Sequence, residues 1–445
     1  MQKLIIDNFK QISHAEIEIK DFLLLIGPQA SGKSTIAKLI YFFMMAQQYY
    51  VDLFNVDNEQ MTVDDVVSRF NIRIINKFQE YFSFTEIPDP HFKMEFLSSV
   101  ENGKGVEFGV ENKRISVGYT KAFRDTFWTV TEKIIALQAQ SKSLIEEEPA
   151  NEMKIRSDFY NRVLKESVAI FDDSNSGLYI PAGRNITVTF SEQFQMLFFG
   201  KLGDKQSQKR IGGNEEDIIR EFMLHSKHLV DFFGNGYRAK LDNPFGQLVL
   251  GIAQKILKGR YQNENGMESI RVDDSSAVAL GNASSGQQES IRIIQDMIYL
   301  LCTELEATRI IEEPEAHIYP EAQKQLIELM VLVANHCHTR MIVTTHSPYI
   351  LSTFNNLLYY SKVLKRHPDK QEEMEKHFLS ESLNTANKEL LGINAEGFEA
   401  YSLDTSREKY CMSIKDEETR LIGDNFFDME TEKLNEDFAF LYNLM

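Results

Sequence analysis

Residues 27–35 constrain this chain more than any other stretch of its sequence. Their sequence, GPQASGKST, matches the pattern G-x-x-x-x-G-K-[ST], with Gly27, Gly32, Lys33 and Ser34 at the fixed positions. In such a loop the backbone N–H groups cradle phosphates, the lysine reaches the β- and γ-phosphates, and the serine hydroxyl ligates Mg²⁺. The pattern therefore predicts a phosphate-binding loop.

The sequence on both sides of this loop supports the same prediction. Residues 22–26 (FLLLI) are an apolar run typical of a buried strand, and residues 34–45 have the apolar spacing of a helix. The loop would then precede a helix N-terminus, where the helix dipole favours a phosphate. We expect the phosphates to contact the whole loop, which consists of Gly27, Pro28, Gln29, Ala30, Ser31, Gly32, Lys33, Ser34 and Thr35.

The composition is that of a large globular protein. Its 445 residues suffice for two or three domains, and 43% of them are apolar, which allows a large core. No uncharged apolar window of about 18 residues occurs and the first residues lack a signal-peptide pattern, so we expect a cytoplasmic protein with no membrane partner. The three cysteines, Cys302, Cys337 and Cys411, lack metal-ligand spacing and predict neither a zinc site nor a disulfide framework.

The charge of the chain bears on DNA as a partner. A net charge of −18 argues against non-specific binding of nucleic acid, because such binding neutralises phosphates with Lys and Arg. Two basic stretches, residues 201–210 and 362–370, leave a local DNA-binding groove open, although solvated loops are the simpler interpretation of both. DNA is therefore a partner that the charge does not favour.

Strand and helix patterns alternate along the first part of the chain. Residues 3–9 and 15–19 predict a strand hairpin, residues 49–86 two helices, and residues 92–119 a three-stranded antiparallel meander. Residues 121–172 predict two long helices joined by a short link. Two arrangements remain open for this helical hairpin: an arm that projects to meet a partner, or helices packed on the same domain.

Three later segments place polar groups where a strand ends or a helix begins. Residues 282–290 (NASSGQQES) open a helix with hydroxyl and N–H donors, which alone is most simply an ordinary N-cap. Residues 308–313 (TRIIEE) are an apolar strand ending in two carboxylates, of which one can hold the water shell of Mg²⁺ while the other polarises an attacking water. Residues 340–345 predict another strand, and His346 follows it. Ligand sites in open α/β sheets gather at strand C-termini, so we expect these groups near the phosphate-binding loop.

Together these motifs resemble the ABC-type ATPase heads of SMC and OLD (overcoming lysogenization defect) proteins. GPQASGKST is similar to Walker A, NASSGQQES to the signature loop, RIIEEPEAH to Walker B with its catalytic glutamate, and TTHSPYIL to the switch-histidine segment. The resemblance covers residues 1–45, 178–184 and 281–352. It implies an α/β fold with a mixed central sheet, an antiparallel β-subdomain and a helical insertion, and it implies ATP and Mg²⁺ as cofactors.

The resemblance also implies roles for the residues that match each motif. Lys33 would bind phosphates, Ser34 and Glu312 would hold Mg²⁺, Glu313 would be the general base, and His346 would sense the γ-phosphate. The signature loop would contact ATP held by a second subunit, so that ATP closes a homo-oligomer through composite sites. The remaining implied contacts are Ser284, Ser285, Gly286 and Gln287 of the signature loop, Arg184 of the YIPAGR segment, and either Gln47 or Gln48 as the Q-loop residue.

The chain departs from the general ABC pattern in ways that OLD-like members share. Glu312 replaces the usual Walker B aspartate, and the signature reads ASSGQ in place of LSGGQ. Residues 357–445 lack the acidic constellation with which a Toprim nuclease would hold metal. The chain therefore resembles the stand-alone ATPases of bacterial anti-phage systems such as Septu and PARIS, which implies a separate effector, a nuclease or a toxin.

The expected domains follow from the positions of the motifs. They are an N-terminal ATPase lobe over residues 1–50, an insertion over 51–177, a C-terminal ATPase lobe over 178–356, and an extension over 357–445. We expect an Mg²⁺-dependent ATPase that acts as sensor and scaffold for the effector. The alternatives are a DNA-binding repair or recombination ATPase of the SMC and RecF kind and a non-catalytic nucleotide-gated module.

Overall fold

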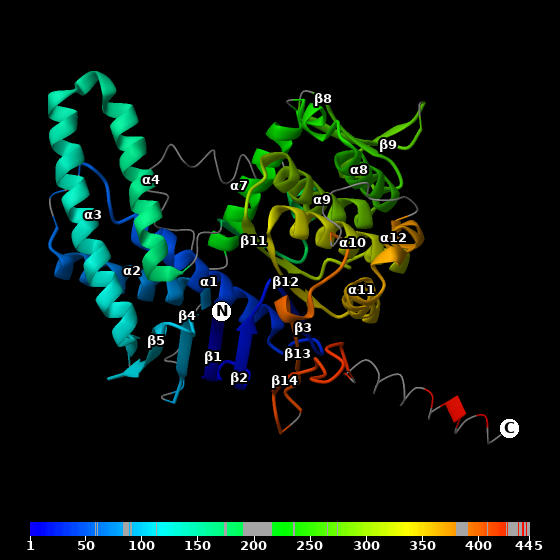
Figure 1. Ribbon diagram of the computed structural model, residues 1–445, viewed down its shortest axis with the longest axis horizontal. Coiled ribbons are helices and arrows are strands. Elements are labelled where there is room, and N and C mark those ends of the chain that lie inside the picture. The colour runs from blue at the N-terminus through cyan, green and yellow to red at the C-terminus, as the bar shows by residue number, and fades with distance from the viewer. Residues whose placement is uncertain are drawn as a thin grey trace.

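The computed structural model describes residues 1–57, 59, 61–82, 89, 91–112, 114–172, 176–189, 216–234, 236–264, 266–273, 275–379, 390–406, 408–423, 425, 435, 438–439 and 442. Within these residues the fold is α/β, as the sequence predicts. A mixed central sheet, an antiparallel sheet and a helical insertion form its main parts (Figure 1).

The six-stranded mixed sheet is the centre of the molecule. Its neighbours pair in parallel except for the antiparallel pair at one edge. The strand order is β14 (Cys411–Ser413), β13 (Phe398–Leu403), β3 (Phe22–Ile26), β12 (Arg340–Thr345), β11 (Ala307–Glu312) and β7 (Ser176–Ile180).

The two faces of this sheet pack into two different cores. Phe22, Leu24 and Ile26 of β3 belong to a core shared with four helices, whereas Leu23 and Leu25 belong to a core on the opposite face. Side chains of a strand alternate between faces, so β3 must be apolar at every position, and all five of its residues are buried. The four helices are α8 (Pro244–Leu257), α9 (Ser285–Thr303), α10 (Pro320–Cys337) and α11 (Pro348–Arg366).

The second core lies between the central sheet and a five-stranded antiparallel sheet. This sheet contains the predicted hairpin and the predicted meander, in the order β2 (Ile12–Ile19), β1 (Gln2–Phe9), β4 (Lys93–Ser99), β5 (Lys104–Glu111) and β6 (Arg114–Tyr119). It joins strands from both sides of residue 50, so the domain boundary expected there divides one sheet. Helix α1 (Lys33–Val51) contributes most of its residues to this core. The prediction of two helices over residues 49–86 is wrong in part, since the described residues there hold the end of α1 and one further helix, α2 (Val63–Phe82).

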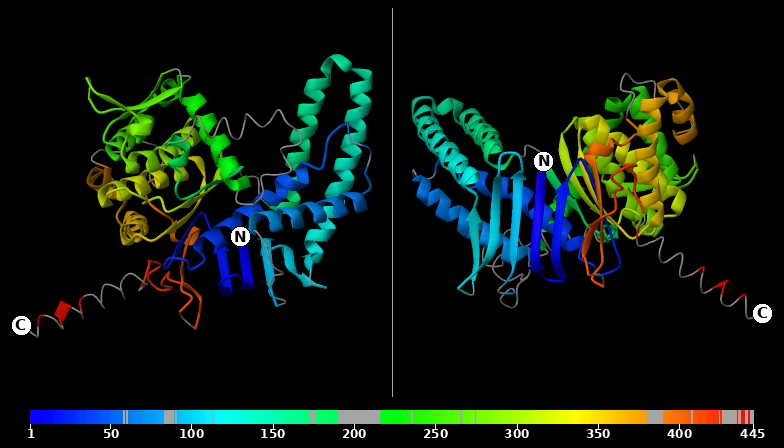
Figure 2. Two further views of the ribbon diagram at one scale, coloured as in Figure 1. Left: turned by 180° about the vertical axis from the view of Figure 1, so that it is seen from behind. Right: turned by 60° about the horizontal axis from the view of Figure 1, so that its bottom comes forward.

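The helical hairpin has a packed base and a projecting tip. It consists of α3 (Lys121–Glu147), the turn η1 (Pro149–Asn151) and α4 (Glu152–Phe171). At the base, the rings of Phe127 and Phe171 lie 5.0 and 5.8 Å from that of Tyr50 on α1. Near the tip, Met153 is 88% exposed, and Figures 1 and 2 show the hairpin standing out from the sheets.

A second group of elements lies on the α8–α11 face of the central sheet. It includes a small antiparallel sheet in the order β10 (Ala277–Ala279), β9 (Met267–Arg271) and β8 (Arg260–Glu264). The helices of this part and of the C-terminal part are α5 (Ile186–Thr189), α7 (Glu216–Phe233), η3 (Tyr237–Leu241), η4 (Leu280–Asn282), η5 (Pro368–Lys370), α12 (Gln371–Leu379) and η6 (Ala395–Gly397).

The C-terminal part differs from the expected extension. Strand β13 pairs in parallel with β3, the strand that leads into the phosphate-binding loop, and Phe398 aligns with Phe22. Strands β13 and β14, which lie within the segment expected as an extension, therefore complete the central sheet.

Candidate active site

Four parallel strands end at one edge of the central sheet, and each is followed by a predicted site segment. The register aligns Ile26 of β3 with Thr345 of β12, and Thr344 of β12 with Glu312 of β11. On the other side of β11, Ile311 aligns with Ile180 of β7. The phosphate-binding loop, His346, Glu313 and the segment that contains Arg184 therefore emerge side by side, where α/β sheets bind their ligands.

The phosphate-binding loop depends on glycine and on the C-terminal part of the chain. Gly27 has φ +150° and Gly32 φ +98°, a region that residues with a Cβ rarely adopt. A Cβ on Gly27 would overlap the carbonyl oxygen of Leu403, and one on Gly32 would overlap the hydroxyl of Tyr410. That hydroxyl donates a hydrogen bond to the carbonyl oxygen of Ser31. Tyr410 follows β13, so the C-terminal part of the chain holds the loop from one side.

Lys33 places its ammonium inside the loop. Its Nζ donates to the carbonyl oxygens of Gly27 at 2.9 Å and Pro28 at 2.8 Å. Burial lowers the pKa of Lys33 to about 8. The carboxylates of Glu313, Glu315 and Glu312 oppose this shift, because nearby negative charge favours the ammonium form.

Glu313 and His346 meet at the ends of β11 and β12. Oε1 of Glu313 lies 3.3 Å from Nε2 of His346, and hydrogen bonding to His346 lowers the pKa of Glu313. The backbone N–H of Glu313 donates to Thr344 at 2.9 Å, and its φ of +42° is uncommon for a residue with a side chain. Glu313 is therefore ionised at neutral pH, only partly buried, and held in an unusual backbone conformation.

Two other carboxylates at this edge are more deeply buried. Oε2 of Glu312 accepts a hydrogen bond from the N–H of Ala182 at 3.2 Å, while its Oε1 is buried without a hydrogen-bond partner. Oε1 of Glu315 accepts from Thr345 Oγ1 at 2.6 Å and from the N–H of His346 at 2.7 Å, and its Oε2 is also buried and unpartnered. Burial raises the pKa of Glu315. Sequence reasoning missed Glu315, because its bonds to the end of β12 leave no signal in the local pattern.

The unpartnered oxygen of Glu312 fits a ligand of a divalent cation. Carboxylate oxygens are the ligands that Mg²⁺ prefers, and Mg²⁺ usually takes only one or two of them, with phosphates and water completing its shell. The described part of the chain contains no group of three or more His, Cys, Asp or Glu side chains that could hold a metal unaided. Ser34, at the start of α1, is exposed and can offer its hydroxyl to the same ion.

Arg184 has a different place from the one expected. Its side chain is 0% exposed, and it donates to backbone carbonyls instead of lining an open nucleotide site. Nη1 bonds the carbonyl of Glu312 at 2.8 Å, Nη2 that of Glu313 at 3.0 Å, and Nε that of Glu289 on α9 at 2.8 Å. Arg184 therefore ties α9 to the backbone of Glu312 and Glu313.

The segment that resembles a signature loop begins α9 with a capping box. Ser284 is the N-cap and exchanges hydrogen bonds with Gln287, whose Nε2 also donates to the carbonyl of Leu257 at 2.6 Å. Ser284 and Ser285 are exposed, whereas Gly286 is buried, and a Cβ on Gly286 would approach the carbonyl oxygen of His317 to 2.6 Å. The loop thus presents the side chains of Ser284 and Ser285 at the surface.

Neither candidate for the Q-loop residue lies at the strand edge. Gln47 and Gln48 are 14 residues or more beyond Lys33 on α1, about 21 Å along the helix axis. Gln47 donates to Ser167 at 2.9 Å and Gln48 to Asp52 at 2.6 Å. Both assignments are therefore wrong, because α1 is longer than the predicted helix and carries these residues towards the arm.

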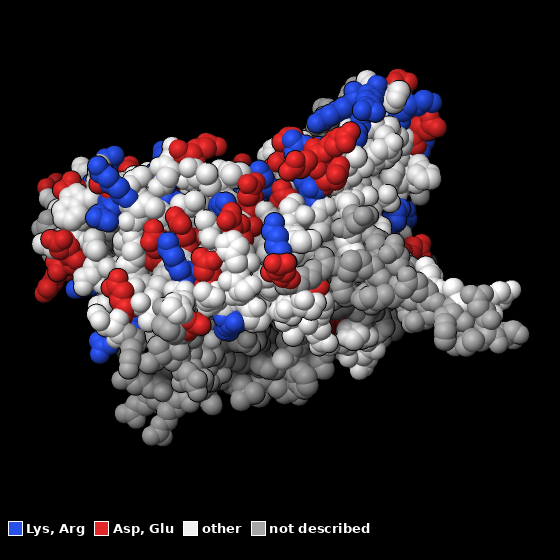
Figure 3. All heavy atoms as spheres, turned by 90° about the horizontal axis from the view of Figure 1, so that it is seen from below, with Lys and Arg blue, Asp and Glu red and all other residues white. Residues whose placement is uncertain are grey.

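The surface gives limited support to a DNA-binding groove. Residues 201–210 lie outside the described residues, and residues 362–370 lie at the end of α11 and in η5. On the face drawn in Figure 3, acidic and basic side chains are interspersed. Among the described helices, none is long and apolar enough to cross a membrane.

Comparison with known proteins gives one family match and several matches of fold. A family model described as AAA ATPase domain matches residues 1–351. No curated protein matches the chain. An SMC head bound to the C-winged helix domain of ScpA is 12% identical, with a TM-score of 0.38, over 79% of this chain and 90% of its own. The SMC head domain from Thermotoga maritima is 12% identical, with a TM-score of 0.33, over 79% of this chain and 90% of its own. The recombination mediator protein RecF with ATPrS is 11% identical, with a TM-score of 0.30, over 78% of this chain and 93% of its own.

Proposed function

This chain belongs to the AAA ATPase domain family and is therefore an ATP hydrolase. We propose that it is an Mg²⁺-dependent switch and that a second copy of the chain completes each of its ATP sites. One observation carries this proposal: the loop with Lys33, the carboxylate of Glu313 and the ring of His346 emerge side by side from parallel strands. Such an edge can hold a triphosphate and activate water beside it.

Binding of ATP would rest on the loop and on α1. The backbone N–H groups of residues 27–35 would cradle the phosphates at the N-terminus of α1, and Lys33 would turn from the carbonyls of Gly27 and Pro28 to the β- and γ-phosphates. Mg²⁺, held by Ser34 and Glu312, would neutralise charge on the phosphate oxygens.

Hydrolysis would use Glu313 as general base. As the water oxygen bonds to the γ-phosphorus, its proton passes to the Glu313 carboxylate and the bond from the γ-phosphorus to the bridging oxygen breaks, which releases ADP and phosphate. His346, 3.3 Å from Glu313, would hold the carboxylate and bond the γ-phosphate. Glu315 would fix this arrangement through its bond to the backbone of His346.

The first experiment removes the base and keeps the site. Glu313→Gln should bind ATP as the wild type does and lose at least 100-fold in turnover, because general-base catalysis contributes about 10²–10⁴-fold. Glu373→Gln, an exposed site on α12, is the matched control. Turnover is measured by phosphate release and binding by equilibrium dialysis. Undiminished turnover in Glu313→Gln would falsify the assignment of the base.

The second copy would act through the signature loop. Ser284 and Ser285 at the start of α9 are exposed and would close on the γ-phosphate held by the other chain. Hydrolysis would remove the group that bridges the two chains and open the assembly. The Glu313→Gln chain with Mg²⁺-ATP should therefore remain in the closed oligomer, which light scattering detects as a larger mass.

The cellular role that we propose is control of a separate effector, a nuclease or toxin, in anti-phage defence, as in the OLD-like stand-alone ATPases that the motifs resemble. The projecting α3–α4 hairpin supplies a surface for such a partner. The test is the plating efficiency of phages on cells that carry this gene with its genomic neighbours. Protection that Glu313→Gln abolishes supports the role, and equal plating with and without the intact genes contradicts it.

A further inference from the structure

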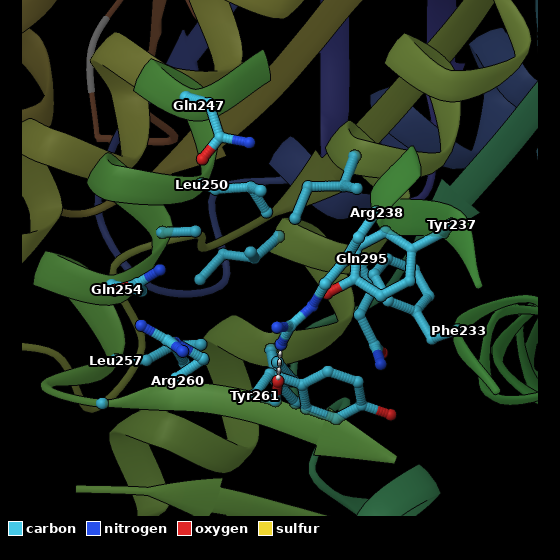
Figure 4. Close-up of a pocket in the computed structure, with 15 residues that line it drawn as sticks. Phe233, Tyr237, Arg238, Gln247, Leu250, Gln254, Leu257, Arg260, Tyr261 and Gln295 are labelled. Atoms are coloured by element: carbon cyan, nitrogen blue, oxygen red, sulfur yellow. Dashed lines mark hydrogen bonds between the residues drawn. The ribbon is translucent and has the colours of Figure 1, made fainter. Parts of the chain in front are cut away.

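A pocket separate from the strand edge lies on the α7–α9 side of the molecule. It has a volume of about 250 Å³ and is formed where α7, η3, α8, β8 and α9 meet (Figure 4). Residues of α9, the helix that starts with the signature loop, contribute Ile291, Ile294, Gln295 and Ile298 to its wall. The pocket thus touches the same helix as the proposed ATP contact but from another face.

The pocket combines aromatic rings with positive charge. The ring of Tyr237 lies 4.4 Å from that of Phe233, and Tyr261 packs edge-on against Phe233 at 5.6 Å. In Figure 4 the guanidinium groups of Arg238 and Arg260 both point into the pocket. Arg238 donates to the carbonyl oxygen of Tyr261 at 3.3 Å.

Among the described residues, no ion pair joins Arg238 or Arg260 to an acidic side chain, although acidic residues outnumber basic ones by 66 to 48 in the chain. A guanidinium binds a phosphate through two parallel N–H donors, and two such groups at one pocket favour a dianion. Gln254, which also lines the pocket, can bond the polar edge of a heterocycle.

We propose that this pocket binds a nucleoside monophosphate, with the base against the aromatic wall and the phosphate on Arg238 and Arg260. The mixed wall of rings, amide and guanidinium groups matches the three parts of the molecule. Nothing in this binding step depends on hydrolysis at the strand edge.

Hydrogen bonds connect the pocket to the glutamates of the proposed active site. Arg292 Nη1 donates to Gln295 Oε1 at 2.7 Å, and Arg292 Nε donates to Thr187 Oγ1 at 3.3 Å. Thr187 Oγ1 donates to the carbonyl of Arg184 at 2.8 Å, and the guanidinium of Arg184 holds the backbone of Glu312 and Glu313. A ligand that displaces Gln295 or α9 would therefore change the rate of ATP hydrolysis, an effect that rests on the proposed function. Such coupling is demonstrated when a ligand bound in the pocket changes the rate of ATP hydrolysis at the strand edge.

The binding test uses the full chain with its ATP site filled by Mg²⁺ and the β,γ-imido analogue of ATP. AMP, GMP, CMP and UMP are titrated separately by calorimetry, and at least one should bind with one site per chain. Arg238→Gln and Arg260→Gln should each weaken it about tenfold, the usual loss for one charged hydrogen-bond partner. Lys258→Gln, exposed and just outside the pocket, is the control and should bind as the wild type. Absence of binding by all four nucleotides, or binding that survives both arginine substitutions, would overturn the proposal.

The coupling test measures ATP turnover with the bound monophosphate. Turnover of the wild type should change at least twofold, and Thr187→Val, which removes the hydroxyl between Arg292 and Arg184, should bind the monophosphate but abolish the response. Binding without any change in wild-type turnover would overturn the coupling. A chain that hydrolyses no ATP at all would instead overturn the proposed function, and the calorimetry would still decide whether the pocket binds.

Discussion

The guanidinium of Arg184 sets the position of the two site glutamates. It is fully buried, and burial lowers its pKa, so its hydrogen bonds to four carbonyl groups must compensate for the lost hydration. We expect Arg184→Lys to lower kcat about tenfold or more with a smaller change in KM, because lysine cannot reproduce the planar fork. Steady-state kinetics measure this, with the exposed Arg366→Lys as control. A wild-type kcat in Arg184→Lys would show that catalysis does not need the hydrogen bonds from the Arg184 guanidinium to the backbone of the site glutamates.

The charge of Lys33 predicts how the reaction depends on pH. Its pKa of about 8 in the folded chain is below the ordinary 10.5, and only the protonated form attracts phosphate. The active form is therefore complete well below pH 8 and is lost as the pH rises through 8. The carboxylate of Glu313, whose pKa is lowered, stays ionised through neutral pH. We expect kcat/KM for ATP to fall about tenfold per pH unit above 8. A profile that stays level to pH 9.5, with the chain still folded by circular dichroism, would contradict this.

At the scale of elements, the strand β13 and the residues after it shape the phosphate-binding loop. The hydroxyl of Tyr410 is the link, through its bond to Ser31. Tyr410→Phe should raise KM for ATP about three- to tenfold and leave kcat within twofold, since one hydrogen bond contributes about 0.5–1.5 kcal/mol. The exposed Tyr359→Phe is the matched control. Equal KM values for Tyr410→Phe and wild type would mean that the C-terminal segment does not position the loop.

Local patterns predicted those elements whose signal is carried by neighbouring residues. Strands β3 and β12, the β4–β6 meander and the α3–α4 hairpin follow from runs and alternation. The pairing of β13 with β3 could not be predicted in this way, because it joins Phe398 to Phe22 across most of the chain. The role of Glu315 and the buried position of Arg184 could not be predicted for the same reason. The hydrogen-bond partners of both residues lie on distant segments of the chain. Motif spacing identifies the residues of such a site, but the contacts between them depend on the packing of the whole sheet.

At the scale of the whole molecule, the proposed switch needs two chains. In that proposal the strand edge holds the loop, the base and the histidine of one half-site, while the exposed Ser284 and Ser285 lie at the start of a helix that Arg184 ties to the same edge. In an assembly closed by ATP, the buried Arg184 would therefore connect two nucleotide contacts. One is the strand edge that binds the nucleotide of its own chain, and the other is the start of α9, which contacts the nucleotide of the partner.

Mixing two inactive variants tests this central claim most directly. Lys33→Ala disables the phosphate-binding loop, and Ser284→Arg blocks the signature loop, so each alone should lack ATP turnover. A mixed dimer pairs the intact loop of one chain with the intact signature of the other, and random pairing should restore roughly a quarter of wild-type turnover. Phosphate release from the 1:1 mixture is compared with each variant alone and with Lys33→Ala mixed with wild type. Recovered turnover is the result that composite sites predict, and a mixture as inactive as its two components would contradict them.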